Sequence, residues 1–524
     1  MNAAGGKIDT KATPLPPPVL VSLKSGLLVE TEDKAYSFKV GGRLFVDGGG
    51  ITQPLNGLSN QVGIRQARLE VVGKMAGIYF YKLSYDFAGT QSISGANQTL
   101  GGIRDAYIGI QSSLTNAPFK GAFFMIGNMF EPFSLSQQSP ILYHDLIERP
   151  LPIDAFSPSR HIGAALGVYG DNWSAKTGVF STSVEDKTLV PAPGVPALWG
   201  IPRALPWQAS GGSRYFDLAG RLTYAPIKDE HTLVHVGVSG RYHQVNDATG
   251  ANDDRVLNLG ARIKSEAFTL NQTLLGTPDL SCGTINAPAP TNIVNASAYA
   301  AKCTKNVETF DLEMAVSHGP FSIQGEYIGS RYNRNQSAIN QAFYLASVNA
   351  ATAALNPTGV PLVPFGRSAY FSGYYAQATW WITGEERAQA YDVAYKNGAA
   401  FTQLNIKNPF SAGGWGAWGL SARYSSVDLN NGPYQGGQLA SWIALAAFSG
   451  NRALAAYVTN VGIQGGKQQD VTVGLNWYPD LGVNFQLNWT RVMNIVAPVN
   501  GNLNQSYSTG AHPNLIEMRA KVYF

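Results

Sequence analysis

The strongest constraint on the fold of this chain is an alternation of apolar and polar side chains that recurs along almost its whole length. Residues 36–47, 233–243 and 483–491 each carry mostly apolar side chains at every second position, with polar or charged side chains between them. Successive side chains of a β-strand point to opposite faces, so this period predicts strands that separate an apolar environment from an aqueous one.

Two kinds of β-protein show this alternation, a soluble sandwich and a transmembrane barrel. The sequence has no stretch of the roughly 18 to 20 uncharged apolar residues that a membrane helix needs, so a membrane location would require a closed barrel. The chain contains 57 Gly, 25 Tyr, 23 Phe and 10 Trp, whereas only 14% of its residues are charged. A soluble surface normally carries more charge. Because the polar faces also hold many Gly and Ser, as a crowded lumen would, we predict the barrel.

The connections between the predicted strands alternate in length. Short ones, such as residues 73–77, 170–172 and 480–482, interleave with long segments rich in Gly, Pro, Asn and Ser. Short periplasmic turns and long external loops give outer-membrane barrels this rhythm. We therefore predict an all-β fold, a transmembrane antiparallel β-barrel of about 16 strands, with about 18 as the alternative count, and with long external loops.

Residues 1–35 differ from the rest of the chain. They contain a cluster of prolines at positions 14–18, which predicts an extended periplasmic N-terminal segment. Residues 36–524 are predicted to form the barrel, and its last strand ends on Phe524, which resembles the assembly signal of outer-membrane barrels. Residues 383–414 are too long for a plain periplasmic turn, so we expect them to fold inward or to lie beneath the barrel.

The segment 131–161 carries more charge than the other predicted loops. It connects strands predicted over residues 122–130 and 162–170, and its charged residues include Glu148, Arg149 and Arg160. Loops of this length without structure of their own are uncommon. An inward fold would place these charges against the barrel wall, so we predict that residues 131–161 form a constriction loop that narrows the pore.

Strand parity assigns the charged side chains that face the lumen. On this assignment the cations outnumber the anions, and several cations fall on strands that barrel closure would place side by side. These are Lys39, Arg43, Arg68, Lys82 and Arg519. A positive wall would raise the local concentration of anions, in a way that salt screens. The alternative is that these charges only hold one another and the inward loop.

Several blocks of the sequence resemble one known family. The run GNMFEPFSLSQQSPILYHDLIERP at residues 127–150 and the run YSFKVGGRLFVD at residue 36 resemble blocks of the phosphate-selective porins O and P, in the expected order. This resemblance implies a trimer of 16-stranded barrels, each with its own pore and a ladder of Arg and Lys that leads to a narrow zone. It also implies that Arg65 and Arg149 belong to the narrow zone, and that Asp105 is a lumen carboxylate there.

Two departures from the family pattern bear on its selectivity. Members that select phosphate resemble one another in having adjacent arginines where this chain has Arg65 and Gln66, and in a lysine of the constriction loop where residues 137–140 offer none. Phosphate recognition needs several charge-assisted donors that converge on one oxyanion, so general anion preference is the firmer expectation. Arg65 also has outward parity, and only a strand end or a bulge could turn it into the lumen.

We predict an outer-membrane porin for passive diffusion of small solutes, with preference for anions such as phosphate through an Arg/Lys-lined pore. The alternatives are a general or sugar-permeable porin without phosphate selectivity, and a structural or adhesive barrel. The expected partners are small anions, outer-membrane lipids and lipopolysaccharide, and two further copies of the chain. The sequence shows no basic run or zinc spacing for nucleic acid binding, and it predicts a Gram-negative outer-membrane location.

The remaining chemistry-bearing residues predict no catalytic or cofactor site. The seven histidines lack the serine context of a hydrolase, so we predict that the protein is not an enzyme and holds no metal or cofactor. Cys282 and Cys303 lie in one polar segment, and an oxidising periplasm would allow a loop disulfide between them, with two free thiols as the alternative.

Overall fold

The structure is a computed structural model of the chain. The described residues are 18–23, 26–51, 61–88, 102–113, 119–181, 216–245, 262–264, 273–277, 280, 303–339, 367–393, 398–431, 463–496 and 512–524.

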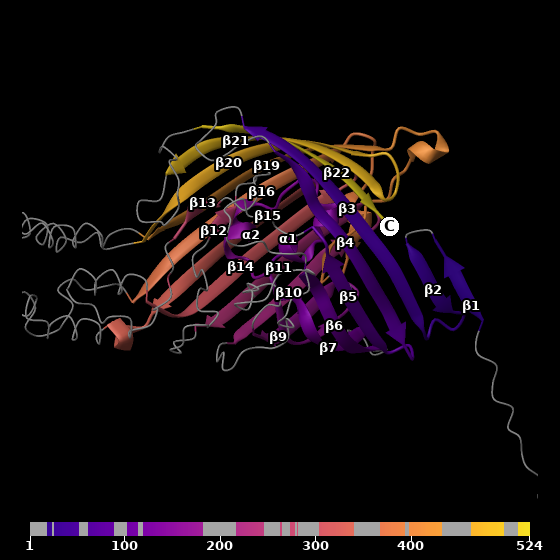
Figure 1. The fold of residues 1–524 in the computed structure, drawn as a ribbon, viewed down its shortest axis with the longest axis horizontal. Coiled ribbons are helices and arrows are strands. Elements are labelled where there is room, and N and C mark those ends of the chain that lie inside the picture. The colour runs from indigo at the N-terminus through magenta and orange to yellow at the C-terminus, as the bar shows by residue number, and fades with distance from the viewer. Residues whose placement is uncertain are drawn as a thin grey trace, which may run out of the picture.

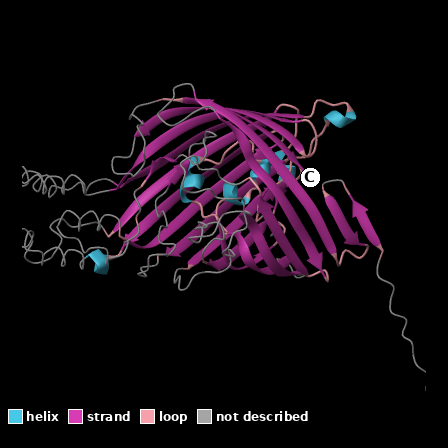
Figure 2. Cartoon of the chain, viewed as in Figure 1, coloured by secondary structure: helices cyan, strands magenta, loops and turns pink. Residues whose placement is uncertain are grey.

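Antiparallel strands form a barrel whose wall is closed (Figures 1 and 2). The last strand of the barrel, β22 (Asn514–Tyr523), pairs with its first strand, β3 (Ser37–Ile51), from Leu515 opposite Ile51 to Tyr523 opposite Arg43. This closure confirms the predicted barrel, with 16 strands rather than 18. The strands are β3 (Ser37–Ile51), β4 (Gln61–Met75), β5 (Tyr79–Asp86), β6 (Gly102–Ser113), β7 (Gly121–Phe130), β8 (Arg160–Tyr169), β9 (Trp173–Phe180), β10 (Asp217–Lys228), β11 (Thr232–Gln244), β14 (Thr304–His318), β15 (Phe321–Arg334), β16 (Ser368–Trp381), β19 (Ala417–Asn431), β20 (Ile463–Tyr478), β21 (Val483–Val496) and β22 (Asn514–Tyr523).

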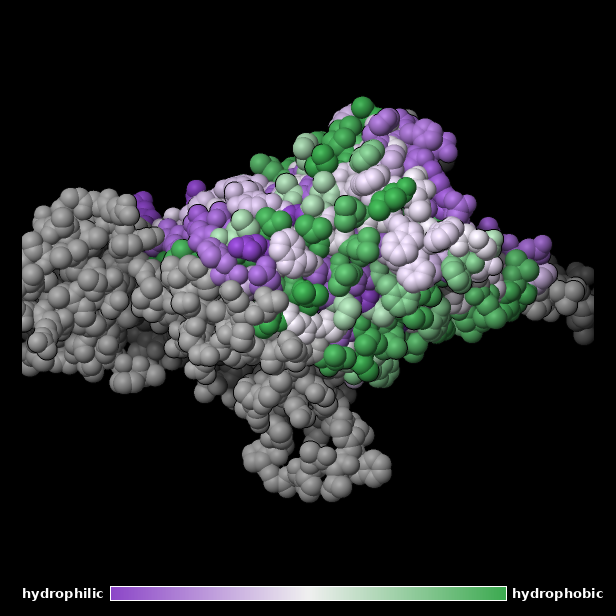
Figure 3. All heavy atoms as spheres, turned by 90° about the horizontal axis from the view of Figure 1, so that it is seen from above, coloured by the Kyte–Doolittle hydropathy of each residue, from purple (hydrophilic) through white to green (hydrophobic). Residues whose placement is uncertain are grey.

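The wall is apolar outside and polar inside. In β14 the outward side chains of Phe310 and Leu312 are 40% and 52% exposed, whereas the inward carboxylates of Asp311 and Glu313 are buried. Figure 3 shows the apolar side chains gathered over the outer surface of the barrel. This distribution is the reverse of that in a soluble protein and suits contact with lipid. In the part of the chain that the structure describes, no helix has the length and apolar composition to cross a membrane.

The two rims of the barrel differ in their connections. Strand order places the short turns 76–78, 170–172 and 229–231 on the same rim as the C-terminus, and the longer connection 131–159 starts from the opposite rim. Outer-membrane barrels have short turns on the periplasmic side. The rim with the C-terminus is therefore the periplasmic rim.

A hairpin precedes the barrel. Its strands β1 (Val19–Ser22) and β2 (Leu27–Thr31) pair with each other, and β2 pairs with the periplasmic end of β3. This contact lies beside the point where Phe524 exchanges two backbone hydrogen bonds with Gly42, at 3.0 and 3.1 Å. The sequence interpretation of residues 1–35 as an extended segment did not foresee this hairpin, and most of that segment lies outside the described residues.

Two connections enter the barrel, the first with its helices inside the wall (Figure 1) and the second only in part. The segment predicted as a constriction loop, residues 131–161, extends here over residues 131–159, because Arg160 and His161 belong to β8. It contains α1 (Leu135–Gln138), η1 (Ile141–Tyr143) and α2 (Leu151–Phe156). The second connection, residues 382–416, leaves the periplasmic rim and is called here the periplasmic segment. Its short elements are η2 (Arg387–Ala390), β17 (Tyr391–Asp392), β18 (Ala400–Phe401) and η3 (Phe410–Ala412). A separate two-stranded ladder consists of β12 (Arg262–Lys264) and β13 (Thr273–Gly276).

Apolar contacts hold both inward segments in place. Leu151 and Ile153 of α2 are buried in one cluster with Phe371 of the wall. Leu135 of α1 is buried in a second cluster with Phe401 of the periplasmic segment. The strands line the lumen with polar side chains. Where the two inward segments enter, however, small apolar clusters fill the lumen.

Candidate pore constriction

Side chains of the wall hold the constriction loop by its backbone carbonyls. Arg423 on β19 donates from Nη1 to the carbonyl oxygen of Glu148 at 2.9 Å, and Arg519 on β22 donates to that of Ile147. Asn476 on β20 donates to a third carbonyl of the loop, at 2.7 Å. Charge-assisted bonds to buried carbonyls are among the stronger hydrogen bonds, so the loop backbone is fixed against this side of the barrel.

The opposite wall holds the start of the loop. Glu326 on β15 accepts hydrogen bonds from the backbone N–H groups of Leu135 at 3.1 Å and Ser136 at 2.9 Å. The hydroxyl of Tyr375 on β16 donates to the same carboxylate at 2.6 Å. The loop therefore spans the lumen between β15 and β22. The alternation of apolar and polar residues in the sequence gives no sign of this role of Glu326, because the partner groups are backbone atoms.

Arg65 reaches the lumen through a β-bulge. The pairing of β3 with β4 passes from Phe45 opposite Gln66 directly to Val46 opposite Ile64, so Arg65 is an extra residue on β4. Strand parity alone puts Arg65 on the outer face. An extra residue re-aims the side chains beside it, and it supplies the condition that the sequence set for an inward Arg65.

Glu148 of the loop lies between two arginines. Its Oε1 atom is 3.4 Å from Nε of Arg65 and 3.0 Å from Nη2 of Arg519, and Arg519 also contacts Asp47 at 2.6 Å. Burial by itself would raise the pKa of Glu148, but the charges of Arg65 and Arg519 outweigh it and lower the pKa to about 2. The carboxylate therefore remains ionised near neutral pH and joins the loop to β4 and β22.

Next to the contact of Glu148 with Arg65 and Arg519, two carboxylates of the wall each form ion pairs with two of three neighbouring cations. Asp105 on β6 lies 2.7 Å from Nε of Arg160 and 3.2 Å from Nζ of Lys82. Glu70 on β4 lies 3.4 Å from Lys82 and 3.1 Å from Arg43. The predicted residues Arg43, Lys82, Asp105 and Arg160 are thus brought into one network.

Asp86 on β5 is shared by Arg68 and a residue that the sequence analysis missed. Nη2 of Arg68 lies 2.9 Å from Asp86, and Nε of Arg104 lies 3.9 Å from the same oxygen. The family resemblance placed Asp105 in the lumen, and the alternation of a regular strand would then turn its neighbour Arg104 toward the lipid. An arginine on the lipid face of a strand is costly, and that conflict was the signal that could have revealed its true direction.

Two predicted residues lie outside these shared ion pairs. Arg149 is half-buried within the loop, and its Nε donates to the carbonyl of Ser136 at 3.4 Å. Burial lowers the pKa of Arg149 to about 10, so it keeps its charge at neutral pH. Lys39 lies toward the periplasmic end of β3, opposite Val72 of β4 and Leu28 of β2. It therefore belongs to the periplasmic mouth, not to the narrow zone.

Exposure separates the two signs of charge in the lumen. Among the described lumen residues, most cations are partly exposed, whereas most carboxylates are buried. The half-exposed cations are Lys39, Arg43, Arg65, Lys74, Lys82, Arg104, Arg149, Arg160, Lys176 and Arg241. The buried carboxylates are Asp47, Asp86, Asp105, Glu131, Asp145, Asp217, Asp311, Glu313, Glu326, Asp470 and Glu517. Glu70, Glu148 and Asp154 are among the acids that stay half-exposed.

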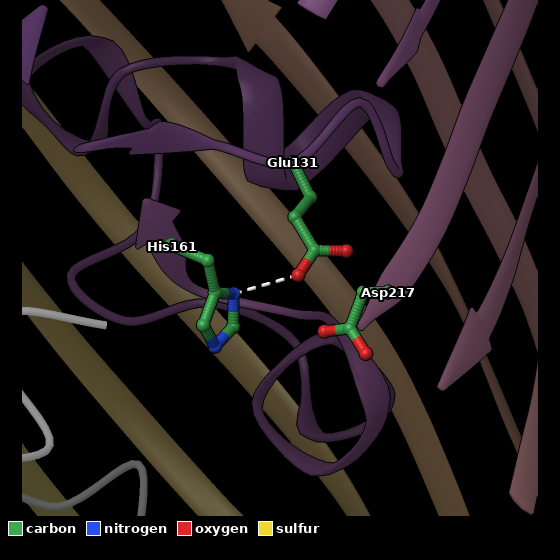
Figure 4. Close-up of side chains that lie close together, drawn as sticks. All are labelled: Glu131, His161 and Asp217. Atoms are coloured by element: carbon green, nitrogen blue, oxygen red, sulfur yellow. Dashed lines mark ion pairs between the residues drawn. The ribbon is translucent and has the colours of Figure 1, made fainter. Parts of the chain in front are cut away.

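Glu131, His161 and Asp217 form a further cluster at the base of the constriction loop (Figure 4). Glu131 lies 2.6 Å from Nδ1 of His161 and 3.1 Å from Nε of Arg241, and Nη2 of Arg241 lies 2.5 Å from Asp217. Two carboxylates and an imidazole could serve as metal ligands. The guanidinium of Arg241 already joins both carboxylates and compensates their charge, so we interpret this cluster as the anchor of the first loop residue.

The predicted disulfide is only partly within the described residues. Cys303 is buried and disulfide-bonded. Cys282 lies outside the described residues, so its pairing with Cys303 stays a prediction.

Residues 38–524 match the profile of the family described as phosphate-selective porin O and P. The chain belongs to this family. This porin is 22% identical to Porin O of Pseudomonas aeruginosa over 418 residues, which cover 79% of this chain and 77% of that protein. It is 21% identical to an uncharacterized protein of Caulobacter vibrioides over 440 residues, with 83% and 69% of the two chains covered.

Solved structures similar to this porin are more distant in sequence. OprB of Pseudomonas putida is 8% identical, with 94% of this chain and 95% of that chain covered and a TM-score of 0.46. The anion-selective porin from Comamonas acidovorans is 9% identical, with 93% and 100% covered and a TM-score of 0.43. Family membership, together with the closed barrel, confirms the prediction of a porin in the Gram-negative outer membrane.

Proposed function

We propose that this porin is a passive diffusion channel that prefers small anions. The observation that carries the proposal is the unequal exposure of charge in the narrow zone. The side chains of Arg65, Arg104 and Lys82 are 36%, 27% and 23% exposed, whereas those of Asp86 and Asp105 are 3% and 7% exposed and only Glu70 among the carboxylates of these networks reaches 24%. A lumen with a positive accessible surface raises the local concentration of anions and speeds their passage.

The two inward segments support a narrow path along the positive wall. They contact each other where the backbone N–H of Phe401 donates to Oγ of Ser139 at 3.2 Å. The periplasmic segment is also bound to β10, since Nη2 of Arg221 donates to the carbonyl of Ala399 at 3.1 Å. Both segments take up lumen space beside β10 to β22, so solutes would pass along β3 to β8, where Arg65, Lys82 and the other half-exposed cations lie.

General anion preference is better supported than tight phosphate selection. Gln66 stands where phosphate-selecting relatives resemble one another in a second arginine, and residues 137–140 contain no lysine. A phosphate ion bound by fewer charge-assisted donors would be held less tightly. Phosphate would then be one of several small anions that pass, and a general or sugar-permeable porin or an adhesive barrel remains the competing function.

We further propose that three copies of the chain assemble as a homotrimer, as the family resemblance implies. The apolar outer face would then contact lipids and lipopolysaccharide where it is not covered by a neighbouring copy. Chemical cross-linking of the purified protein in detergent should give a trimer band, and a monomer at every cross-linker concentration would contradict this assembly.

Planar bilayers that hold the purified protein test the proposed function. A tenfold gradient of potassium chloride should give a zero-current potential of the sign that chloride flux produces. A potential near zero would support a general porin instead, and the absence of conductance would support a structural or adhesive barrel. Cation preference would contradict the proposal outright.

A further inference from the structure

Arg104 lies at a second β-bulge of the narrow zone, on β6. The pairing with β5 passes from Leu83 opposite Ala106 to Tyr85 opposite Ile103, so β6 contributes one residue more than β5 over this stretch. An extra residue lets neighbouring side chains leave the strict alternation of a strand. Both Asp105 and Arg104 therefore reach lumen carboxylates or cations, although they are adjacent in the sequence.

Side chains of the wall stabilise this bulge. The backbone N–H of Asp105 donates to Oγ of Ser84 at 2.9 Å. The side-chain amide of Asn128 donates to the carbonyl of Arg104 at 2.5 Å. A bulge leaves backbone groups outside the ladder, and buried backbone groups need hydrogen-bond partners. Ser84 and Asn128 supply them, so the direction of Arg104 is built into the wall.

Arg104 and Arg65 each share a carboxylate with a second arginine that is buried. Asp86 receives two hydrogen bonds from Arg68, at 2.9 and 3.3 Å, and the more distant Arg104 shares the same carboxylate. The side chain of Arg68 is 5% exposed and that of Arg104 is 27% exposed. At the first bulge, likewise, the side chain of Arg519 is 0% exposed and that of Arg65 is 36% exposed. In each case one carboxylate faces two guanidinium groups, and the arginine from the bulge is the one open to the lumen.

We propose that Arg104 is a selectivity-determining residue of this pore, which acts with Arg65 on small inorganic anions. The inference rests on the proposed function and deepens it. Each bulge turns one more guanidinium group toward the lumen, where it is more exposed than the arginine that shares its carboxylate. Arginine also offers several donors in a plane, which suits both chloride and oxyanions such as phosphate.

Substitution of Arg104 tests the proposal in planar bilayers. Arg104→Gln should lower the permeability ratio of chloride to potassium roughly two- to tenfold, because a charge at the narrow zone is removed. Arg104→Lys should keep most of the ratio, since it keeps the charge. Arg331→Gln is the matched control, because Arg331 lies on the outer, exposed face of β15.

The outcomes separate this inference from the proposed function. An unchanged ratio in Arg104→Gln, beside an anion-selective wild type, would overturn the role of Arg104 and leave the function intact. A wild type without anion preference would overturn both. Equal losses in Arg104→Gln and Arg331→Gln would show an indirect effect of lost charge and would also overturn the specific role.

A cysteine at position 104 gives an independent readout of its direction. Arg104→Cys should react with a charged methanethiosulfonate reagent added to the aqueous phase, and the single-channel conductance should change on reaction. Ile108→Cys, at an outward position with 61% exposure, should show no such change. A position 104 that responds like position 108 would contradict the inward bulge.

Discussion

At Glu148 the constriction loop meets two guanidinium groups with different tasks. Arg519 is fully buried and bound to Asp47 as well, so its loss would leave the buried carboxylate of Asp47 without its arginine. Such a loss typically costs about 3–5 kcal/mol of folding free energy. Arg65 binds the same Glu148 from a half-exposed position. We therefore assign the stability of this contact mainly to Arg519 and its effect on permeating ions mainly to Arg65.

Replacement of Arg65 and Arg149 together tests whether the cations next to Glu148 determine the anion selectivity of the pore. The double variant Arg65→Gln, Arg149→Gln removes two half-exposed cations beside Glu148 and should lower the permeability ratio of chloride to potassium roughly tenfold. The ratio follows from zero-current potentials, with Arg491→Gln on the exposed part of β21 as the control. A double variant as anion-selective as the control would remove both residues from the mechanism.

The lowered pKa of Glu148 predicts how acid affects the loop. A carboxylate whose pKa is lowered on folding stabilises the fold above its unfolded pKa, and this contribution is lost as the pH falls toward the folded value. Because the folded pKa is about 2, the contact should survive at pH 5 and weaken only below about pH 4.

Single-channel recordings can follow this contact. The size and noise of the open current should be the same at pH 7 and pH 5, and Glu148→Gln should show the noisier current at both values. A wild-type current that becomes noisy already at pH 5 would disagree with a strongly held carboxylate.

At the scale of elements, the periplasmic segment is joined to the wall by an exposed ion pair. Nδ1 of His231, in the turn between β10 and β11, lies 2.5 Å from Glu386, and Nζ of Lys407 lies 3.0 Å from the same carboxylate. The hydrogen bond and the charge of Glu386 raise the pKa of His231. The protonated imidazole therefore persists somewhat above its usual range of pH.

This shift predicts that alkaline pH loosens the periplasmic segment. A histidine with a raised pKa contributes fully below its unfolded pKa of about 6.5 and loses the contribution as the pH rises through the folded value. Amide hydrogen exchange in residues 382–393, corrected for its intrinsic dependence on pH, should be faster at pH 9 than at pH 6. His231→Gln should remove most of this difference, whereas His318→Gln should keep it. An unchanged difference in His231→Gln would exclude the ion pair as its cause.

Many strands of the wall could be predicted from the sequence, because the alternation of apolar and polar residues within a strand shows which side chains face the lumen. The inward positions of Arg43, Arg68 and Lys82 follow from parity alone. Arg104 could not be placed in this way, since a bulge depends on Ser84 and Asn128, which lie on other strands. The residues that anchor the constriction loop could not be predicted either, because their partners are far away in the sequence. Arg423, for example, binds a backbone carbonyl 275 positions earlier, and no local pattern records such a contact.

At the scale of the whole molecule, the barrel separates its charges by burial. Carboxylates such as Asp311 and Glu326 lie beneath the inward segments or behind other side chains, whereas cations such as Arg65 and Lys82 stay open to the lumen. The net charge of the chain is only +4, so the net charge by itself does not predict an anion channel. The selectivity that we propose arises from which charges the solute can approach.

The dependence of the zero-current potential on ionic strength tests this account most directly. The range of an exposed charge falls from about 10 Å in 0.1 M salt to about 3 Å in 1 M salt. Wild-type channels under a fixed ratio of potassium chloride across the bilayer should therefore show strong anion preference at a mean concentration near 0.1 M, and weaker preference near 1 M. Cation preference, or an equal potential at both concentrations, would contradict a pore whose selectivity comes from its open cations.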